Sequence, residues 1–178
     1  MGRMVALLRA VNVGGRKLPM AELRSLCGEL GWRDVATYIQ SGNVVFSADG
    51  MAEAIETQLE DAIARQYGFA APVMVRTAAQ WASYPPGNPF PQAAKDEPNR
   101  LMLLLSKRPP ARDAEDLIQA RATEGEIVKR AGDVLWIHFP DGAGASKLSP
   151  AAIDRAIGSA ATSRNHRTVV KLKEMLET

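Results

Sequence analysis

The sequence predicts an α+β fold made of two consecutive units, because the element order βαββαβ can be read twice along its 178 residues. Short apolar runs of strand length alternate with longer segments whose apolar residues recur every three or four positions. A proline-rich stretch over residues 77–98 separates the two sets of elements. We therefore expect a first domain over residues 1–76, a linker over 77–98 and a second domain over 99–178 that ends in a C-terminal helix.

The first unit opens with an apolar run of strand length, followed by a loop that contains two glycines. Pro19 suits the first turn of a helix, and the apolar stripe behind it stops at Gly31, a typical helix end. The stripe includes Cys27, which we expect to be buried and unreactive. In order, the expected elements are a strand over Met4–Leu8, a helix from Pro19 to Gly31, a hairpin of Val35–Ile39 and Asn43–Ser47, a helix over Met51–Tyr67 and a strand over Val73–Val75.

The second unit repeats this order without residue-level identity to the first, so the repeat is one of elements and not of sequence. Within the linker, a short helical piece is expected around Trp81. The elements expected after the linker are a strand over Leu101–Leu105, a helix over Ala111–Ala122, a hairpin of Ile127–Arg130 and Val134–Phe139, a helix over Pro150–Ile157, a strand over Ala160–Ser163 and a final helix over His166–Leu176.

The order βαββαβ is that of the ferredoxin-like fold, in which an antiparallel sheet with strand order 4-1-3-2 carries both helices on one face. Its connectivity places the loop after the first strand at the same end of the sheet as the hairpin between the second and third strands. In the first unit, residues 12–17 and 40–43 should therefore meet at one edge.

The composition is that of a folded protein without a dominant charge, because 46% of the residues are hydrophobic, 24% are charged and the formal net charge is +2. These values exclude a disordered chain and a strongly basic protein that coats nucleic acid. One cysteine and two histidines exclude an intramolecular disulfide and a Cys/His zinc site, and no metal or cofactor is expected. Apolar stretches are too short for a signal peptide or a membrane span, so we expect a cytoplasmic protein without a membrane partner.

Three segments resemble one protein family. The longest is LLRAVNVGGRKLPMAELRSLCGELGWRDVATYIQSGNVVF at residues 7–46, and the others are NPF at 88–90 and TSRNHRTVVKL at 162–172. In these segments the chain is similar to the bacterial family catalogued as domain of unknown function 1697. The resemblance covers nearly the whole chain and implies two tandem ferredoxin-like domains. It implies no activity, because that family is uncharacterised.

The loop after the first strand carries the first candidate binding residues. Gly14 and Gly15 let the backbone approach a ligand, and Lys17 adds positive charge before a helix whose first N–H groups are unpaired. Asn12 belongs to the same loop, and Arg9, at the end of the strand, points either to this edge or into solvent. The alternative is an ordinary turn, since the loop matches neither the Walker pattern nor the dinucleotide-binding fingerprint.

The hairpin turn supplies a second group of candidates. Gln40, Ser41 and Asn43 surround a glycine with more hydrogen-bonding capacity than a tight turn requires. Turn chemistry alone is the competing explanation, above all for Asn43. We expect Gln40 and Ser41 to contribute to a ligand site because the topology places them beside the glycine-containing loop.

A third group lies where the last strand is followed by the last helix. Asn165 suits a helix N-cap, and Arg164, Thr168 and Lys171 recur at a spacing that places them on one helical stripe. The stripe is either a solvated basic face or part of the binding site, to which we assign Arg164 and Asn165. Trp136 shares one face of a strand with His138 and could form a weak stacking platform, although burial in an interface explains it more simply.

Together these residues favour a binding module for a phosphate-bearing ligand, such as a nucleotide or a nucleic acid. An enzyme that acts on a phosphorylated small molecule is one alternative, although the sequence contains no familiar nucleophile or acid–base motif. A structural protein that assembles through sheet edges, for example as a homodimer, is another.

Overall fold

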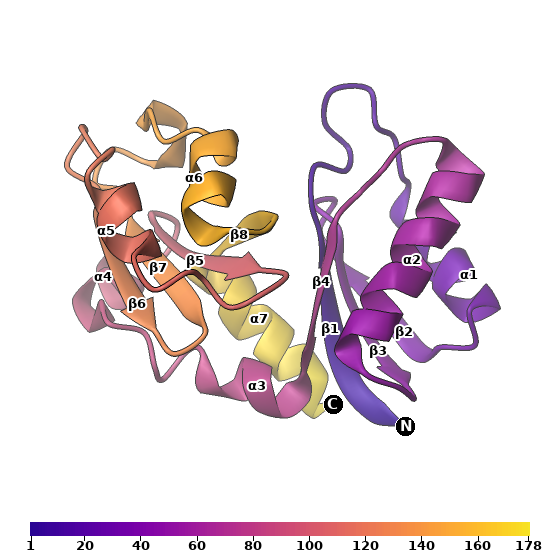
Figure 1. Cartoon of the computed structure of the whole chain (residues 1–178). Helices are drawn as coiled ribbons and strands as arrows, with labels where there is room; N and C mark the ends of the chain where they lie inside the picture. The colour runs from indigo at the N-terminus through magenta and orange to yellow at the C-terminus, as the bar shows by residue number, and fades with distance from the viewer. The chain divides into compact units, whose positions relative to one another are not determined.

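The computed structural model describes all residues, 1–178, and has a mixed α+β fold with two four-stranded antiparallel sheets and seven α-helices (Figure 1). The chain divides into two compact units. Residues 1–82 and 172–178 form the first unit, and residues 83–171 form the second. No helix is both long enough and apolar enough to cross a membrane.

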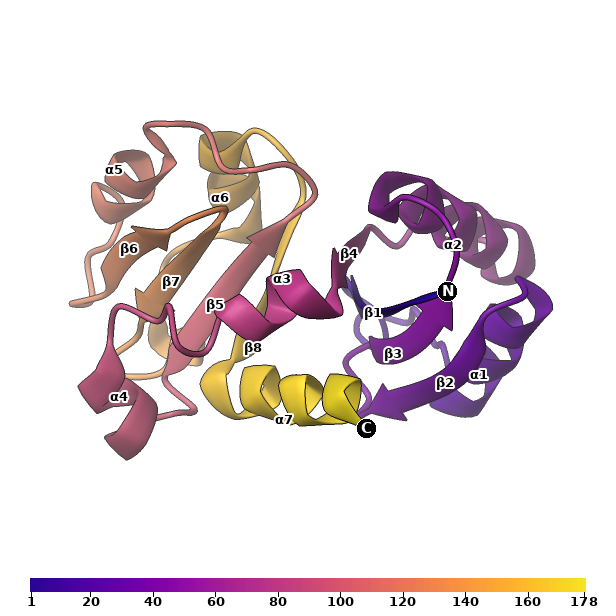
Figure 2. The ribbon, with the colours of Figure 1, turned by 90° about the horizontal axis from the view of Figure 1, so that it is seen from below.

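The first unit has the predicted element order. Its elements are β1 (Gly2–Leu8), α1 (Met20–Glu29), β2 (Arg33–Tyr38), β3 (Asn43–Ala48), α2 (Ala52–Tyr67), β4 (Val73–Thr77) and α3 (Ala78–Ser83). The strands lie in the order β2-β3-β1-β4, and every neighbouring pair is antiparallel, as predicted. Both α1 and α2 lie on one face of this sheet (Figure 2).

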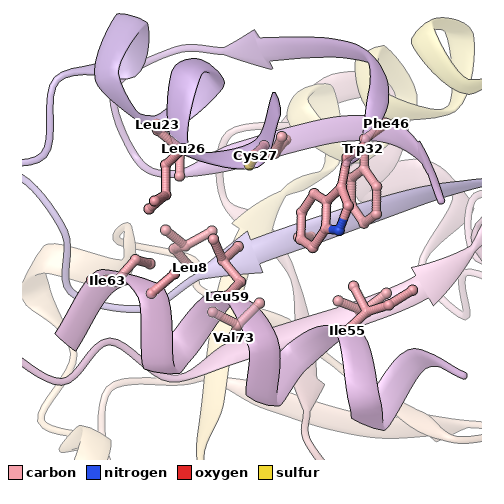
Figure 3. Close-up of a cluster of buried hydrophobic side chains, with 14 of the residues drawn as sticks. Leu8, Leu23, Leu26, Cys27, Trp32, Phe46, Ile55, Leu59, Ile63 and Val73 are labelled. Carbon is pink, nitrogen blue, oxygen red and sulfur yellow. The ribbon is translucent and has the colours of Figure 1, made fainter. Parts of the chain in front are cut away.

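The core of the first unit lies between these helices and the sheet. Alternate strand residues point to it, as the two-residue period of a strand requires, and they meet the apolar stripes of α1 and α2 (Figure 3). Trp32 stacks on Phe46 with ring centroids 4.1 Å apart. Cys27 is fully buried among these residues, which confirms the burial predicted from its place in the helical stripe.

The second unit also has four antiparallel strands, in the equivalent order β6-β7-β5-β8. Its elements are α4 (Pro91–Asp96), β5 (Leu101–Ser106), α5 (Ala114–Gln119), β6 (Ile127–Ala131), β7 (Val134–His138), a 3₁₀ turn η1 (Ala143–Ala145), α6 (Pro150–Ile157) and β8 (Ala161–Asn165). Helix α7 (His166–Glu177) begins in this unit, and its residues from 172 onward belong to the first unit. Helices α5 and α6 lie side by side on one face of the sheet (Figure 2).

Two segments of the second unit differ from the expectation. The helix expected over residues 111–122 is shorter, because it begins at Ala114 and ends at Gln119. The proline-rich stretch contains α4, which was not expected, since Pro91 occupies the first helical turn, where a proline without an N–H group is tolerated.

Candidate functional site

Asn12 organises the glycine loop (residues 12–17) of the first unit. Its Oδ1 accepts a hydrogen bond from the Leu18 N–H at 2.9 Å, and its Nδ2 donates to the Leu18 carbonyl at 3.0 Å. The same Nδ2 donates to the Gln40 carbonyl at 2.8 Å. The side chain of Asn12 therefore closes the loop and attaches it to the hairpin. This contact brings the two segments together at the predicted edge, here called the glycine-loop edge (residues 12–17 and 40–43).

The backbone at this edge adopts several left-handed conformations. Within the edge, φ is positive at Asn12 (58°), Gly14 (57°), Gly15 (82°) and Gly42 (79°), and it is also positive at Ala10 (56°) and Ile39 (49°) directly beside it. Asparagine tolerates this region, whereas alanine and β-branched isoleucine pay a steric cost there. Such strain gathers at binding and catalytic sites more often than elsewhere.

The glycine loop presents backbone donors to solvent. The N–H groups of Val13, Gly14 and Gly15 donate to no protein acceptor, and all three residues are exposed. No atom lies within 4 Å of the position that a Cβ would take on either glycine, so the space above the loop is open. The exposed cation Lys17 follows directly, and α1 then starts without a side-chain cap. Adjacent free N–H groups beside positive charge are suited to an anion.

The hairpin residues have different roles from one another. Asn43 is fully buried, and its Nδ2 donates to the Tyr38 carbonyl at 2.9 Å and to Ser41 Oγ at 3.0 Å, so it supports the turn from inside. Gln40 and Ser41 are exposed at the edge. Arg9 is half-buried, and its backbone N–H donates to the Pro72 carbonyl.

Gly42 is the glycine that packing requires. A Cβ at this position would lie 2.7 Å from Leu8 Cβ and 2.7 Å from Val11 Cγ2, and φ is 79°. The chain therefore needs glycine here so that the hairpin can approach β1 closely. At positions 14 and 15, only the left-handed backbone conformation favours glycine.

The C-terminal candidates lie in β8 of the second unit. Asn165 Oδ1 accepts a hydrogen bond from the Thr168 N–H at 2.9 Å, which is the predicted N-cap of α7. Arg164 is only 7% exposed, and its Nη1 donates to Thr162 Oγ1 and to the Ser163 carbonyl. Burial lowers the pKa of its guanidinium to about 10. A solvated basic face is therefore wrong for Arg164 and Thr168, since both are buried.

Trp136 is also completely buried, so it cannot offer a surface for stacking. Its Nε1 has no hydrogen-bond partner, and its ring lies 6.0 Å from that of His166. The residue lines a cavity of about 330 Å³ together with Tyr84, whose hydroxyl donates to Asp133 at 3.1 Å. No group of three or more His, Cys, Asp or Glu side chains is arranged to hold a metal ion.

Sequence reasoning missed a second cluster in this unit. His138 Nε2 lies 2.9 Å from Glu97 Oε2, and the His138 ring lies 6.2 Å from that of Phe90. These residues come from β7, from the end of α4 and from the segment before α4, so no short motif contains them. The one available signal was the NPF segment, which resembles a known family without indicating what its phenylalanine contacts.

Comparison with known proteins identifies the family. The family described as "Protein of unknown function (DUF1697)" matches residues 1–136, which include the whole glycine-loop edge. The chain belongs to this family. Among curated proteins, none matches the chain. Among solved structures, the chain is similar to the conserved bacterial protein SP0830 from Streptococcus pneumoniae, with 24% identity, a TM-score of 0.70 and coverage of 100% of this chain and 99% of that chain. At this identity the likeness shows the fold alone.

Proposed function

We propose that the first unit is a binding module for a phosphate-bearing ligand, a nucleotide or a nucleic acid, and that it binds the phosphate at the glycine-loop edge. The observation that carries this proposal is the row of unpartnered N–H groups at Val13, Gly14 and Gly15 beside Lys17. Phosphate oxygens accept several hydrogen bonds at once, and a loop that precedes a helix N-terminus supplies such donors.

The side chains around the loop divide into supports and contacts. Asn12 and Asn43 hold the loop and the turn through their own hydrogen bonds, so their contribution to binding is positional. Gln40 and Ser41 are exposed at the same edge and supply hydrogen-bonding groups for the remainder of the ligand. Lys17 contributes charge that salt screens, because it is exposed.

We also propose that residues 1–76 and residues 99–178 each form a ferredoxin-like domain, with a linker over residues 77–98 between them. The element order βαββαβ and the identical strand orders of the two sheets support this assignment. In the first unit the fold is what places the loop after β1 beside the hairpin between β2 and β3.

The experiment is a titration of the ¹⁵N-labelled protein with inorganic phosphate, pyrophosphate and a mononucleotide, followed through backbone amide shifts. We expect the amides of Val13, Gly14 and Gly15 to shift most, and the affinity to fall as salt is raised. Lys17→Ala should weaken binding several-fold at low salt. Lys147→Ala is the matched control, because Lys147 is an exposed lysine in the other unit.

A glycine substitution separates backbone contact from charge. Gly14→Val should abolish binding, since its side chain enters the open space above the loop. Because valine is strained at φ 57°, Gly14→Asn is a second variant that tolerates this conformation and still fills the space. Wild-type affinity in folded Gly14→Asn and in Lys17→Ala would rule out the glycine-loop edge as the binding site.

A further inference from the structure

A cavity of about 530 Å³ lies on the second unit, and it is separate from the residues assigned above to phosphate binding. Its walls are formed by residues of α4 together with Phe90, Glu97 and His138. Small-molecule sites have volumes in this range, with apolar walls and a few polar groups that orient the ligand. This cavity has both features.

Phe90 forms the aromatic wall, and its position is fixed locally. Asn88 Oδ1 accepts a hydrogen bond from the Phe90 N–H at 2.8 Å, an Asx-type turn that orients the NPF segment. Lys129 Nζ lies over the Phe90 ring, 5.3 Å from its centroid, although Lys129 does not line the cavity. The ring is half-buried rather than part of the core, so an aromatic surface remains accessible to a ligand.

Glu97 supplies a carboxylate whose orientation is fixed from two sides. Its Oε2 lies 2.9 Å from His138 Nε2, and its Oε1 accepts a hydrogen bond from Arg100 Nη1 at 3.1 Å. Its side chain is still 40% exposed, and each carboxylate oxygen has capacity for a further hydrogen bond. Asp96 lines the same cavity, whereas no lysine or arginine does. The polar groups therefore favour a ligand that donates hydrogen bonds.

A second cavity, of about 370 Å³, shares the acidic residues Asp96 and Glu97 with the first cavity. Its other side is lined by positively charged residues. Arg100 and Arg167 line this cavity together with Asn99. Arg167 is exposed at the start of α7, where its guanidinium is available to an anion.

We propose that these two adjoining cavities bind a mononucleotide, with the base against Phe90 and the phosphate at Arg167. A base presents a flat ring for stacking and N–H groups for the carboxylates. Guanine fits best, because its ring N–H and amino group lie side by side and can both donate to one carboxylate. The site takes its charge from Arg167, and it does not depend on the phosphate site proposed for the first unit.

The test compares guanosine, uridine and guanosine monophosphate by calorimetry and by amide shifts of the second unit. Guanosine, which carries no charge, should bind at least tenfold more tightly than uridine. Guanosine monophosphate should bind more tightly again, and Arg167→Ala should remove this difference. Phe90→Leu keeps an apolar side chain but loses stacking, so it should weaken guanosine binding about tenfold.

Matched controls identify the site. Phe69→Leu changes another half-buried phenylalanine, and Lys17→Ala removes charge from the glycine loop, so neither should alter guanosine binding. Equal affinity for guanosine and uridine, or unchanged affinity in folded Phe90→Leu, overturns the proposal. Displacement of guanosine by putrescine also overturns it, because the cavities would then select a positive charge rather than a base.

Discussion

The side-chain Nδ2 of Asn12 donates to the backbone carbonyl of Gln40 at 2.8 Å, and this contact joins two segments that are 28 residues apart in the sequence. The loop after β1 and the β2–β3 hairpin are thereby held as one surface. Because the same amide also bonds Leu18, the side chain has little capacity left for a ligand. Asn12 positions the glycine-loop edge rather than contacting what binds there.

Asn12→Ala should lower the free energy of unfolding by about 2–4 kcal/mol, since each lost hydrogen bond contributes about 1 kcal/mol and alanine is strained at positive φ. Asn12→Gly removes the same hydrogen bonds without that strain, so it should cost less. Urea denaturation of the two variants measures both contributions. A loss below about 0.5 kcal/mol in Asn12→Ala would contradict a structural role.

Gly42 and Gly14 should respond very differently to alanine. A Cβ at Gly42 collides with Leu8 and Val11 and is also strained by the backbone, so Gly42→Ala should cost more than about 3 kcal/mol. Gly14→Ala meets no neighbour and should cost about 1–2 kcal/mol from its conformation alone. Thermal or urea unfolding of the two variants measures the comparison. Equal losses in the free energy of unfolding would show that the residues around Gly42 accommodate a Cβ without energetic cost.

Hydrophobic periodicity predicted the βαββαβ order in each half of the chain, because it reflects which face of each element is buried. The strand order followed from the connectivity of the ferredoxin-like fold, and both sheets have that order. The periodicity also placed Cys27 in the core. The connectivity of the elements predicted that residues 12–17 and 40–43 would meet at one edge. The contact between Asn12 and Gln40 confirms that these segments meet.

The roles of single side chains at this edge could not be predicted in the same way. Asn43 has a polar side chain of the kind that binds ligands. Its burial, however, depends on how the hairpin packs against β1, and the sequence does not show that packing directly. The same limit applies to Arg164. Its spacing from Thr168 and Lys171 is compatible with a solvated helical stripe, but Arg164 lies in β8 and its side chain is buried. Phe90, Glu97 and His138 meet only in three dimensions, so no local pattern marks them.

Glu56 protects an edge strand and should be important for stability. It is 4% exposed, and its Oε1 accepts a hydrogen bond from the Val75 N–H at 2.8 Å, while Glu60 one turn later accepts from the Val73 N–H at 2.7 Å. Strand β4 lies at the edge of its sheet, so the N–H groups of Val73 and Val75 point away from the neighbouring strand. The two carboxylates accept hydrogen bonds from these otherwise unpaired donors.

Glu56→Ala should therefore lower the free energy of unfolding by about 1–3 kcal/mol, because a buried N–H loses its acceptor. Glu56→Gln retains a carbonyl acceptor and should cost less. Hydrogen exchange at Val75, measured with urea denaturation, should accelerate in the alanine variant. Unchanged exchange there would show that water or another group replaces the carboxylate.

In the second unit, α5 gives β6 the same protection. Gln119 Oε1 accepts from the Val128 N–H at 2.8 Å, and Glu115 Oε2 accepts from the Arg130 N–H at 2.7 Å. Like Glu56 and Glu60, these residues are four positions apart on a helix, which places them on one face. Gln119→Ala should thus destabilise the protein in the same direction as Glu56→Ala, measured by urea denaturation. Gln119→Glu keeps the acceptor for the Val128 N–H but loses the donor to the Glu126 carbonyl, so it should restore only part of the stability.

Cys27 should make stability fall at alkaline pH. Burial raises the pKa of its thiol from 9.0 to about 12, so the folded protein retains the proton where the unfolded chain releases it. The contribution is fully present below pH 9 and is lost as the pH rises towards about 12. Over this window the free energy of unfolding should decline by up to about 1.4 kcal/mol per pH unit relative to Cys27→Ala. Urea denaturation at several pH values gives both curves, and parallel curves would contradict the burial of the thiol.

In the native state at neutral pH, a thiol reagent should label Cys27 only as fast as the protein unfolds, because the reactive thiolate is disfavoured and the sulfur is enclosed.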